Sequence, residues 1–143
     1  MNKRVLVLLA GLALCVLTAC AEKEKTPVPP PDLTGDWTQS IDEDWYQIAT
    51  ISEDKIEIWW YLASTGHKDL YWSGTFTPPT DSTEPYTWES RNHYTQEELD
   101  ATYHYHRTSR EEVKTFTYQD GKLSYNVTSG HLRLGFVLKR ASE

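Results

Sequence analysis

Apolar and aromatic residues recur at every second position along most of the chain, in runs that short turn signals separate. The clearest example is the pair of runs 116–118 and 123–127, which flank Asp120-Gly121. Asp-Gly suits a type I′ turn because both central residues need positive φ. Period-two alternation is typical of strands with one buried face, so the chain is expected to be all-β. The hairpin is expected to pair Tyr118 with Leu123 and Phe116 with Tyr125.

The same alternation predicts further strands on both sides of this hairpin. A two-residue turn at Glu53-Asp54 predicts that Ile51 pairs with Ile56 and Ala49 with Ile58. A turn at Ser129-Gly130 would pair Val127 with Leu132. The paired prolines in 78–82 make that segment a loop. Strands are expected at 35–38, 45–51, 55–62, 70–76, 86–90, 103–107 and 132–138.

Alternation also predicts which side chains face inward. The inward sets are Ile56, Ile58, Trp60 and Leu62; Leu70, Trp72, Gly74 and Phe76; and Leu132, Leu134, Phe136 and Leu138. Trp59, Tyr61 and Tyr71 are then expected on the opposite face. Exposed aromatic side chains on a sheet can stack on sugar rings or anchor a protein partner, so these three are candidate binding residues. The alternative is that a loop or helix covers them.

Eight or nine short strands, each turning directly into the next, would leave two exposed edges in an open sheet. Closure into a small antiparallel up-and-down barrel removes those edges, and a two-sheet β-sandwich is the alternative. The spacing of Thr95 and Glu98 matches a capping box and predicts one short helix that ends before Tyr103.

The N-terminal residues predict an export signal. Lys3 and Arg4 precede an apolar run, and 17–20 reads Leu-Thr-Ala-Cys. This stretch resembles the lipobox of bacterial lipoproteins. The resemblance implies that residues 1–19 are removed and that Cys20 receives a diacylglycerol, with acyl chains such as palmitate. Two acyl chains suffice for stable anchoring.

The expected domains are a signal peptide (1–19), an acylated cysteine with a proline-rich tether (20–31) and a barrel (32–143). Loss of residues 1–19 removes two positive charges and takes the formal charge from −7 to −9. That acidity argues against nucleic acid as a partner. With Cys15 removed and Cys20 acylated, no disulfide is expected. The expected location is a bacterial membrane surface, or the outer membrane of a Gram-negative host.

Gly35-Asp36-Trp37, near the start of the barrel, resembles the Gly-x-Trp signature of the lipocalin superfamily. The resemblance implies that Trp37 plugs one end of the barrel and that an arginine of the last strand packs on its ring. Arg133 is the first candidate and Arg140 the second. The whole chain also resembles small lipoproteins of bacteria and their prophages.

No catalytic motif occurs in the sequence, so an enzyme is not expected. His104 and His106 would share one face of a strand, which makes them a weak candidate metal pair, but no metal or other cofactor is expected. The expected function is non-catalytic binding of an envelope protein or a cell-wall glycan. The alternative is a lipocalin-type carrier of a small apolar ligand.

Overall fold

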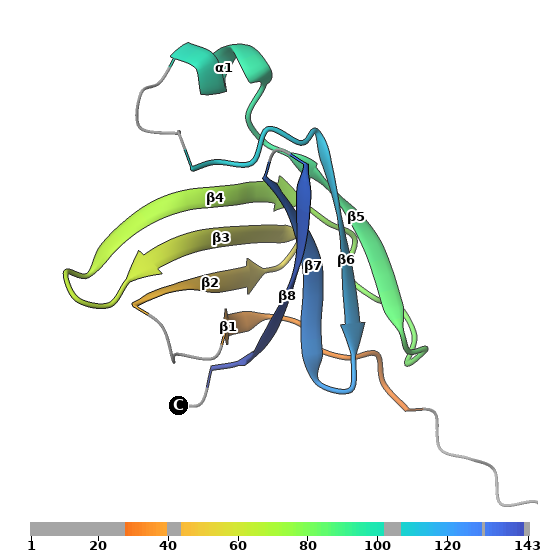
Figure 1. The fold of residues 1–143 in the computed structure, drawn as a ribbon. Helices are drawn as coiled ribbons and strands as arrows, with labels where there is room; N and C mark the ends of the chain where they lie inside the picture. The colour runs from red at the N-terminus through yellow and green to blue at the C-terminus, as the bar shows by residue number, and fades with distance from the viewer. Residues whose placement is uncertain (1–27, 40–43, 102–106, 130, 142–143) are drawn as a thin grey trace, which may run out of the picture.

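The computed structural model describes residues 28–39, 44–101, 107–129 and 131–141. Within them, eight antiparallel strands follow one another in chain order around a closed barrel, and a short helix lies outside one end (Figure 1). The elements are β1 (Gly35–Thr38), β2 (Trp45–Ser52), β3 (Lys55–Leu62), β4 (His67–Thr75), β5 (Tyr86–Asn92), α1 (Gln96–Ala101), β6 (Val113–Gln119), β7 (Lys122–Ser129) and β8 (Leu132–Arg140). The predicted all-β barrel is confirmed, and the β-sandwich alternative is wrong.

Two tight turns have the geometry that their sequences predict. Asp120 and Gly121 have φ values of 51° and 71°, as a type I′ turn requires. Glu53 has a φ of 47° in the other turn. The pairings in both hairpins are those expected: Tyr118–Leu123, Phe116–Tyr125, Ile51–Ile56 and Ala49–Ile58.

The hairpin between β7 and β8 has a different register from the one predicted. Ser129 remains in the ladder and pairs with Leu132, and Val127 pairs with Leu134. The residues of β8 that alternate inward are still those predicted, because a shift of two residues leaves every side chain on the same face of the sheet. The residues that alternate inward are not all buried. Leu138 is fully buried, whereas Leu132 and Leu134 are 66% and 49% exposed.

A β-bulge changes the facing of β4. Ile58 pairs with Trp72 but Trp59 pairs with Leu70, so Tyr71 is an extra residue on β4. The predicted inward position of Leu70 and outward position of Tyr71 are therefore wrong. Leu70 shares the outer face with Trp59, and Tyr71 lies inside the barrel next to Trp72.

The segment after α1 completes the hydrogen bonding beside the bulge. β4 pairs with β5 at only two positions, Gly74–Asn92 and Thr75–Arg91. The carbonyl of Tyr71 instead accepts a hydrogen bond from the Ser109 amide at 2.8 Å, and the carbonyl of Leu70 accepts one from the Thr108 hydroxyl at 2.8 Å.

The predicted capping box is present. The Thr95 amide donates to Glu98 at 2.8 Å, and the Glu98 amide donates to the Thr95 hydroxyl at 3.2 Å. The predicted strand 103–107 lies outside the described residues except for Arg107, which is in a turn.

Aromatic rings fill the barrel. Trp88 stacks on Phe116 with ring centroids 5.5 Å apart, and the Trp72 ring lies 6.5 Å from that of Phe116. Tyr125 extends the column and stacks on Phe136 at 5.9 Å. Trp72 donates its indole N–H to the Ser90 hydroxyl at 3.0 Å. These rings take up interior space that an open cup would leave for a ligand.

Candidate functional site

Trp37 closes the end of the barrel at which the chain enters. It is 1% exposed, and its indole N–H donates to the Leu33 carbonyl at 3.0 Å. The guanidinium of Arg140 lies 4.8 Å from the Trp37 ring centroid and donates to the carbonyl oxygens of Asp32 and Thr34. Arg140, the second candidate in the sequence, thus packs on the ring.

Arg133 does not take this role, because β8 meets β1 only at its last two residues. Trp37 pairs with Arg140, and Thr38 with Lys139. Arg133 lies seven residues earlier and pairs with Thr128 of β7. Gly35 has a φ of +113°, and a Cβ there would lie 3.0 Å from the Arg140 guanidinium. Glycine therefore lets both the chain and the arginine reach the plug.

Two of the three candidate aromatic residues share the outer face of β3. Trp59 lies opposite Ile48, and Tyr61 lies opposite Tyr46, with the two tyrosine rings 5.1 Å apart. The Lys68 ammonium lies 5.9 Å from the Tyr61 ring centroid. Trp59 and Tyr61 are half-buried, so part of each ring faces solvent. We name Tyr46, Trp59 and Tyr61 the aromatic face.

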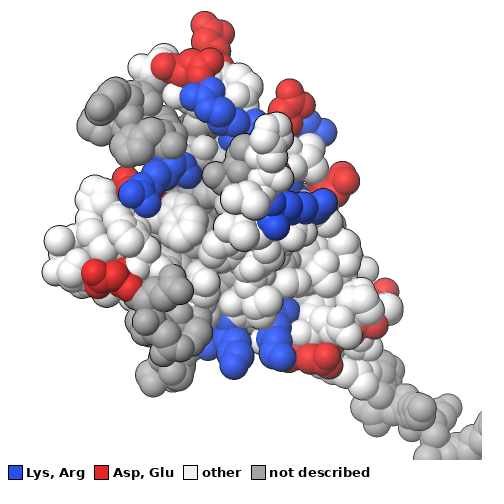
Figure 2. Space-filling view, viewed as in Figure 1, with Lys and Arg blue, Asp and Glu red and all other residues white. Residues whose placement is uncertain are grey.

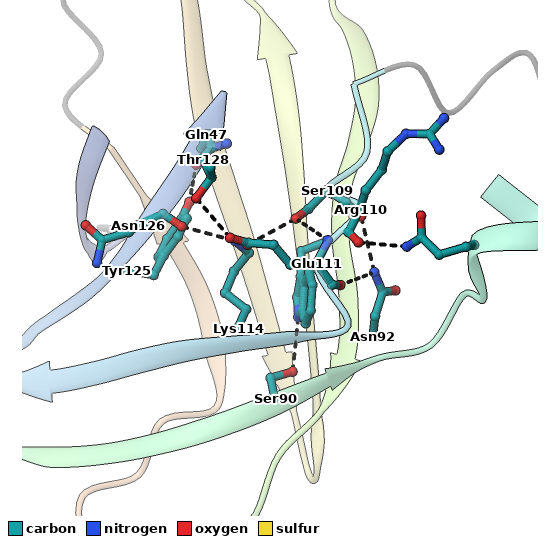
Figure 3. Close-up of polar contacts among 12 residues, drawn as sticks. Gln47, Ser90, Asn92, Ser109, Arg110, Glu111, Lys114, Tyr125, Asn126 and Thr128 are labelled. Atoms are coloured by element: carbon teal, nitrogen blue, oxygen red, sulfur yellow. Dashed lines mark hydrogen bonds and ion pairs between the residues drawn. The ribbon is translucent and has the colours of Figure 1, made fainter. Parts of the chain in front are cut away.

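Tyr71 is separate from the aromatic face because the bulge directs it into the barrel, where it is 4% exposed. Its ring packs against Tyr125 at 6.4 Å and against Trp60 at 6.1 Å. Burial raises the pKa of its hydroxyl. Through its contacts with Lys114 and Tyr125 it belongs to a polar cluster, which we define as Gln47, Tyr71, Glu111, Lys114 and Tyr125. Figure 3 labels the other four members.

Lys114 is the central cation of the polar cluster and is 3% exposed. Its ammonium donates to Glu111 and, at 3.0 Å, to the carbonyl of Asn126. It also lies 5.1 Å and 5.3 Å from the rings of Tyr71 and Trp72. Burial lowers the pKa of this ammonium, although the bond to Glu111 acts in the opposite direction.

Two donors of the polar cluster lack partners among the described residues. The Tyr125 hydroxyl donates to the Gln47 side-chain oxygen, which leaves the Gln47 amide nitrogen unpaired. The Tyr71 hydroxyl also meets no partner at hydrogen-bond geometry. Buried donors of this kind are commonly met by internal water.

The sequence contained a signal for Lys114 that the pattern analysis missed. Lys114, Phe116 and Tyr118 alternate, so extending the strand two residues toward the N-terminus places the lysine inward. A charged residue inside a barrel contradicts the apolar pattern and needs a partner. Glu111, three residues earlier, is that partner.

A cleft of about 310 Å³ lies between the end of β5 and the start of α1. Polar side chains that line the cleft are already hydrogen-bonded to the segment 109–111. The Asn92 amide donates to the carbonyls of Ser109 and Glu111, and the Gln96 amide donates to that of Arg110 (Figure 3). The lining residues are Arg91, Asn92, Tyr94, Thr95, Gln96 and Glu112.

Cys20, His104 and His106 lie outside the described residues. In the described part of the chain, no three histidine, cysteine or acidic side chains converge as a metal site would require. No helix there is long and apolar enough to cross a membrane.

Comparison of the chain with protein-family models, with curated proteins and with solved structures finds no significant match.

Proposed function

We propose that this protein is an exported, lipid-anchored surface protein that binds an envelope partner without catalysing a reaction. The observation that carries the proposal is the aromatic face, where Trp59 and Tyr61 present partly exposed rings on the outside of β3. Such rings bury a large apolar area at small cost in side-chain entropy, which suits recognition of a protein or a sugar.

The fold is compatible with an anchor at Cys20. The chain enters the barrel beside Leu33 and Trp37, at the end opposite α1 (Figure 1). A proline-rich tether of extended conformation spans about 3.1 Å per residue. An anchored barrel would thus have its plugged end toward the membrane and its other end toward potential partners.

Carriage of a small apolar ligand is the less favoured alternative. Trp72, Phe116 and Tyr125 are at most 4% exposed and occupy the middle of the barrel. A ligand that entered the barrel would have to displace these rings. The Phe116 centroid lies 6.5 Å from that of Trp72 and 5.2 Å from that of Tyr125. The aromatic face needs no such rearrangement.

The anchor is tested by labelling cells that express the full chain with radioactive palmitate. We expect the wild type and Cys15→Ser to be labelled, because Cys15 lies in the part that is removed, and Cys20→Ser to be unlabelled. Equal labelling of Cys20→Ser and the wild type would refute acylation at this residue.

The binding surface is tested with two adjacent tryptophans that face opposite ways. Trp59→Ala, on the outer face, should no longer capture envelope proteins or no longer sediment with purified cell-wall glycan. The folding stability of this variant should stay close to that of the wild type. Trp60→Ala removes a ring that packs against the core and should cost about 3 kcal/mol of folding free energy. Unchanged capture and sedimentation by folded Trp59→Ala, alone and combined with Tyr61→Ala, would contradict the proposal.

A further inference from the structure

The aromatic face presents too little apolar surface to form the centre of a protein–protein interface by itself. Trp59 and Tyr61 are half-buried, and Tyr46 is 9% exposed. Because one aromatic side chain offers about 150–250 Å², the three rings together present on the order of 200 Å² to solvent. A specific protein interface buries roughly 800 Å² on each partner. One face of a sugar ring is close in size to a single indole or phenol ring, so the aromatic face matches a carbohydrate better.

Polar side chains continue the same outer surface next to Trp59. Glu57 lies two residues before Trp59 on β3 and therefore on the same face, roughly 7 Å away along the strand. Thr50 lies opposite Glu57, and its hydroxyl donates to the Asp36 carboxylate at 2.7 Å. The Lys55 ammonium lies 2.6 Å from the Glu57 carboxylate. We name Asp36, Thr50, Lys55 and Glu57 the polar strip.

A ring beside fixed hydrogen-bonding groups suits the two sides of a sugar. The C–H groups on one face of a pyranose are apolar and can lie flat on an aromatic ring, whereas the hydroxyls at its edge need hydrogen-bond partners. A pyranose stacked on Trp59 would direct edge hydroxyls toward the polar strip, where the Glu57 carboxylate can accept strong hydrogen bonds. Sites for small ligands commonly combine apolar surface with a few polar groups that fix orientation.

The charges around this surface disfavour a polyanionic glycan. The polar strip has two carboxylates and one ammonium, and Lys68 adds a second ammonium beside Tyr61. These charges cancel, and the chain as a whole carries a formal net charge of −7. On the face seen in Figure 2, basic and acidic side chains of the described residues are interspersed rather than gathered into areas of one sign. Polyanions bind where lysine and arginine cluster, so an uncharged glycan fits better.

We propose that the aromatic face and the polar strip together bind an uncharged polysaccharide of the envelope, an inference that rests on the proposed function and adds the class of partner. One sugar ring stacks on Trp59, and the carboxylates of Glu57 and Asp36 accept hydrogen bonds from sugar hydroxyls. A protein is the competing occupant of this surface.

The probes are soluble uncharged tetrasaccharides of glucose, galactose, mannose and N-acetylglucosamine, with an oligogalacturonate as the polyanionic control. Binding to the purified full-length protein is followed by NMR of the six tryptophan indole N–H groups. At least one uncharged tetrasaccharide should shift the Trp59 signal, which is the one absent from Trp59→Phe. The signal of Trp72, which donates to Ser90 inside the barrel, should not move. The affinity should differ by less than about twofold between low and high salt, because the sugar carries no charge to screen.

Substitutions on the two faces of the sheet provide the matched test. Trp59→Ala should weaken tetrasaccharide binding at least about tenfold because the stacking ring is lost, and Trp59→Phe should retain part of the binding. Glu57→Gln should weaken it about fivefold, because a charged acceptor is replaced by a neutral one. Trp45→Ala is the control, since Trp45 is also half-buried but lies on the other face of the sheet, with the Arg107 guanidinium 4.1 Å from its ring centroid. This variant should bind as the wild type does.

The outcomes separate this inference from the proposed function. Failure of every uncharged tetrasaccharide to bind, tighter binding of the oligogalacturonate, or equal losses in folded Trp45→Ala and Trp59→Ala would overturn the inference. If no saccharide binds while Trp59→Ala still loses capture of envelope proteins, the proposed function stands and the partner is a protein. If neither sugar binding nor protein capture depends on Trp59, both fail.

Discussion

The two arginines of β8, Arg133 and Arg140, have different surroundings. Arg140 contacts the Trp37 ring and two carbonyls, whereas Arg133 forms no ion pair among the described residues. We expect Arg140→Ala to lower the free energy of unfolding by about 1–2 kcal/mol, because a cation–π contact and charged hydrogen bonds are lost. Arg133→Ala should change it by less than about 0.5 kcal/mol. Urea denaturation of both variants measures the difference, and equal losses would contradict the role assigned to Arg140.

Glu111 gives the folded barrel a specific pH dependence. Burial raises the pKa of this carboxyl, but hydrogen bonds from Lys114, Thr128 and Ser109 outweigh burial, and the pKa is lowered. A lowered folded pKa stabilises the fold above the unfolded value of about 4.3, and this stabilisation disappears as the pH falls through the folded pKa. Thermal unfolding should be measured at pH 7 and at successively lower pH. The melting temperature of Glu111→Gln should therefore fall less on acidification than that of the wild type. The exposed control Glu89→Gln should match the wild type.

β4 and β5 are joined by very few backbone pairs, and Gly74 belongs to one of these pairs. β4 meets β5 only at Gly74 and Thr75, and a Cβ on Gly74 would overlap the Ser90 hydroxyl and lie 2.5 Å from the Arg91 carbonyl oxygen. We expect Gly74→Ala to cost more than about 3 kcal/mol, because the backbone must move. Gly135→Ala on β8 has room and should stay within about 0.5 kcal/mol. Denaturation midpoints compare the two, and a tolerated Gly74→Ala would show that this junction can open.

The elements were predictable where local sequence determines them. The turns at Glu53-Asp54 and Asp120-Gly121 fixed the registers of two hairpins, because turn chemistry acts over a few residues. The bulge at Tyr71 was missed, since it depends on how β4 meets β3 and on the segment 108–109. The choice between Arg133 and Arg140 likewise depends on the point where β1 reaches β8. Of the three candidate aromatic residues, Trp59 and Tyr61 lie on the outer face as predicted, and Tyr71 does not.

The molecule as a whole begins its core before the first strand. Leu33 is 3% exposed, packs in the central cluster and accepts the hydrogen bond of Trp37. We expect a chain shortened to begin at Val28 to melt at the same temperature as the chain that begins at Cys20. A chain that begins at Gly35 should lose at least about 3 kcal/mol, because a buried leucine, its carbonyl and the two carbonyls that bind Arg140 are removed. Circular dichroism melts test this, and equal melting of all three would place the start of the core later.

The bulge has a consequence for recognising relatives of this protein. Tyr71 acts as a one-residue insertion in β4, and it reverses the facing of every residue from His67 to Leu70 relative to regular alternation. A relative without the insertion would keep the same fold while its hydrophobic positions in this strand were offset by one. Alignment of β4 by alternation would then match inward residues of one protein with outward residues of the other. A one-residue gap at position 71 restores the correspondence.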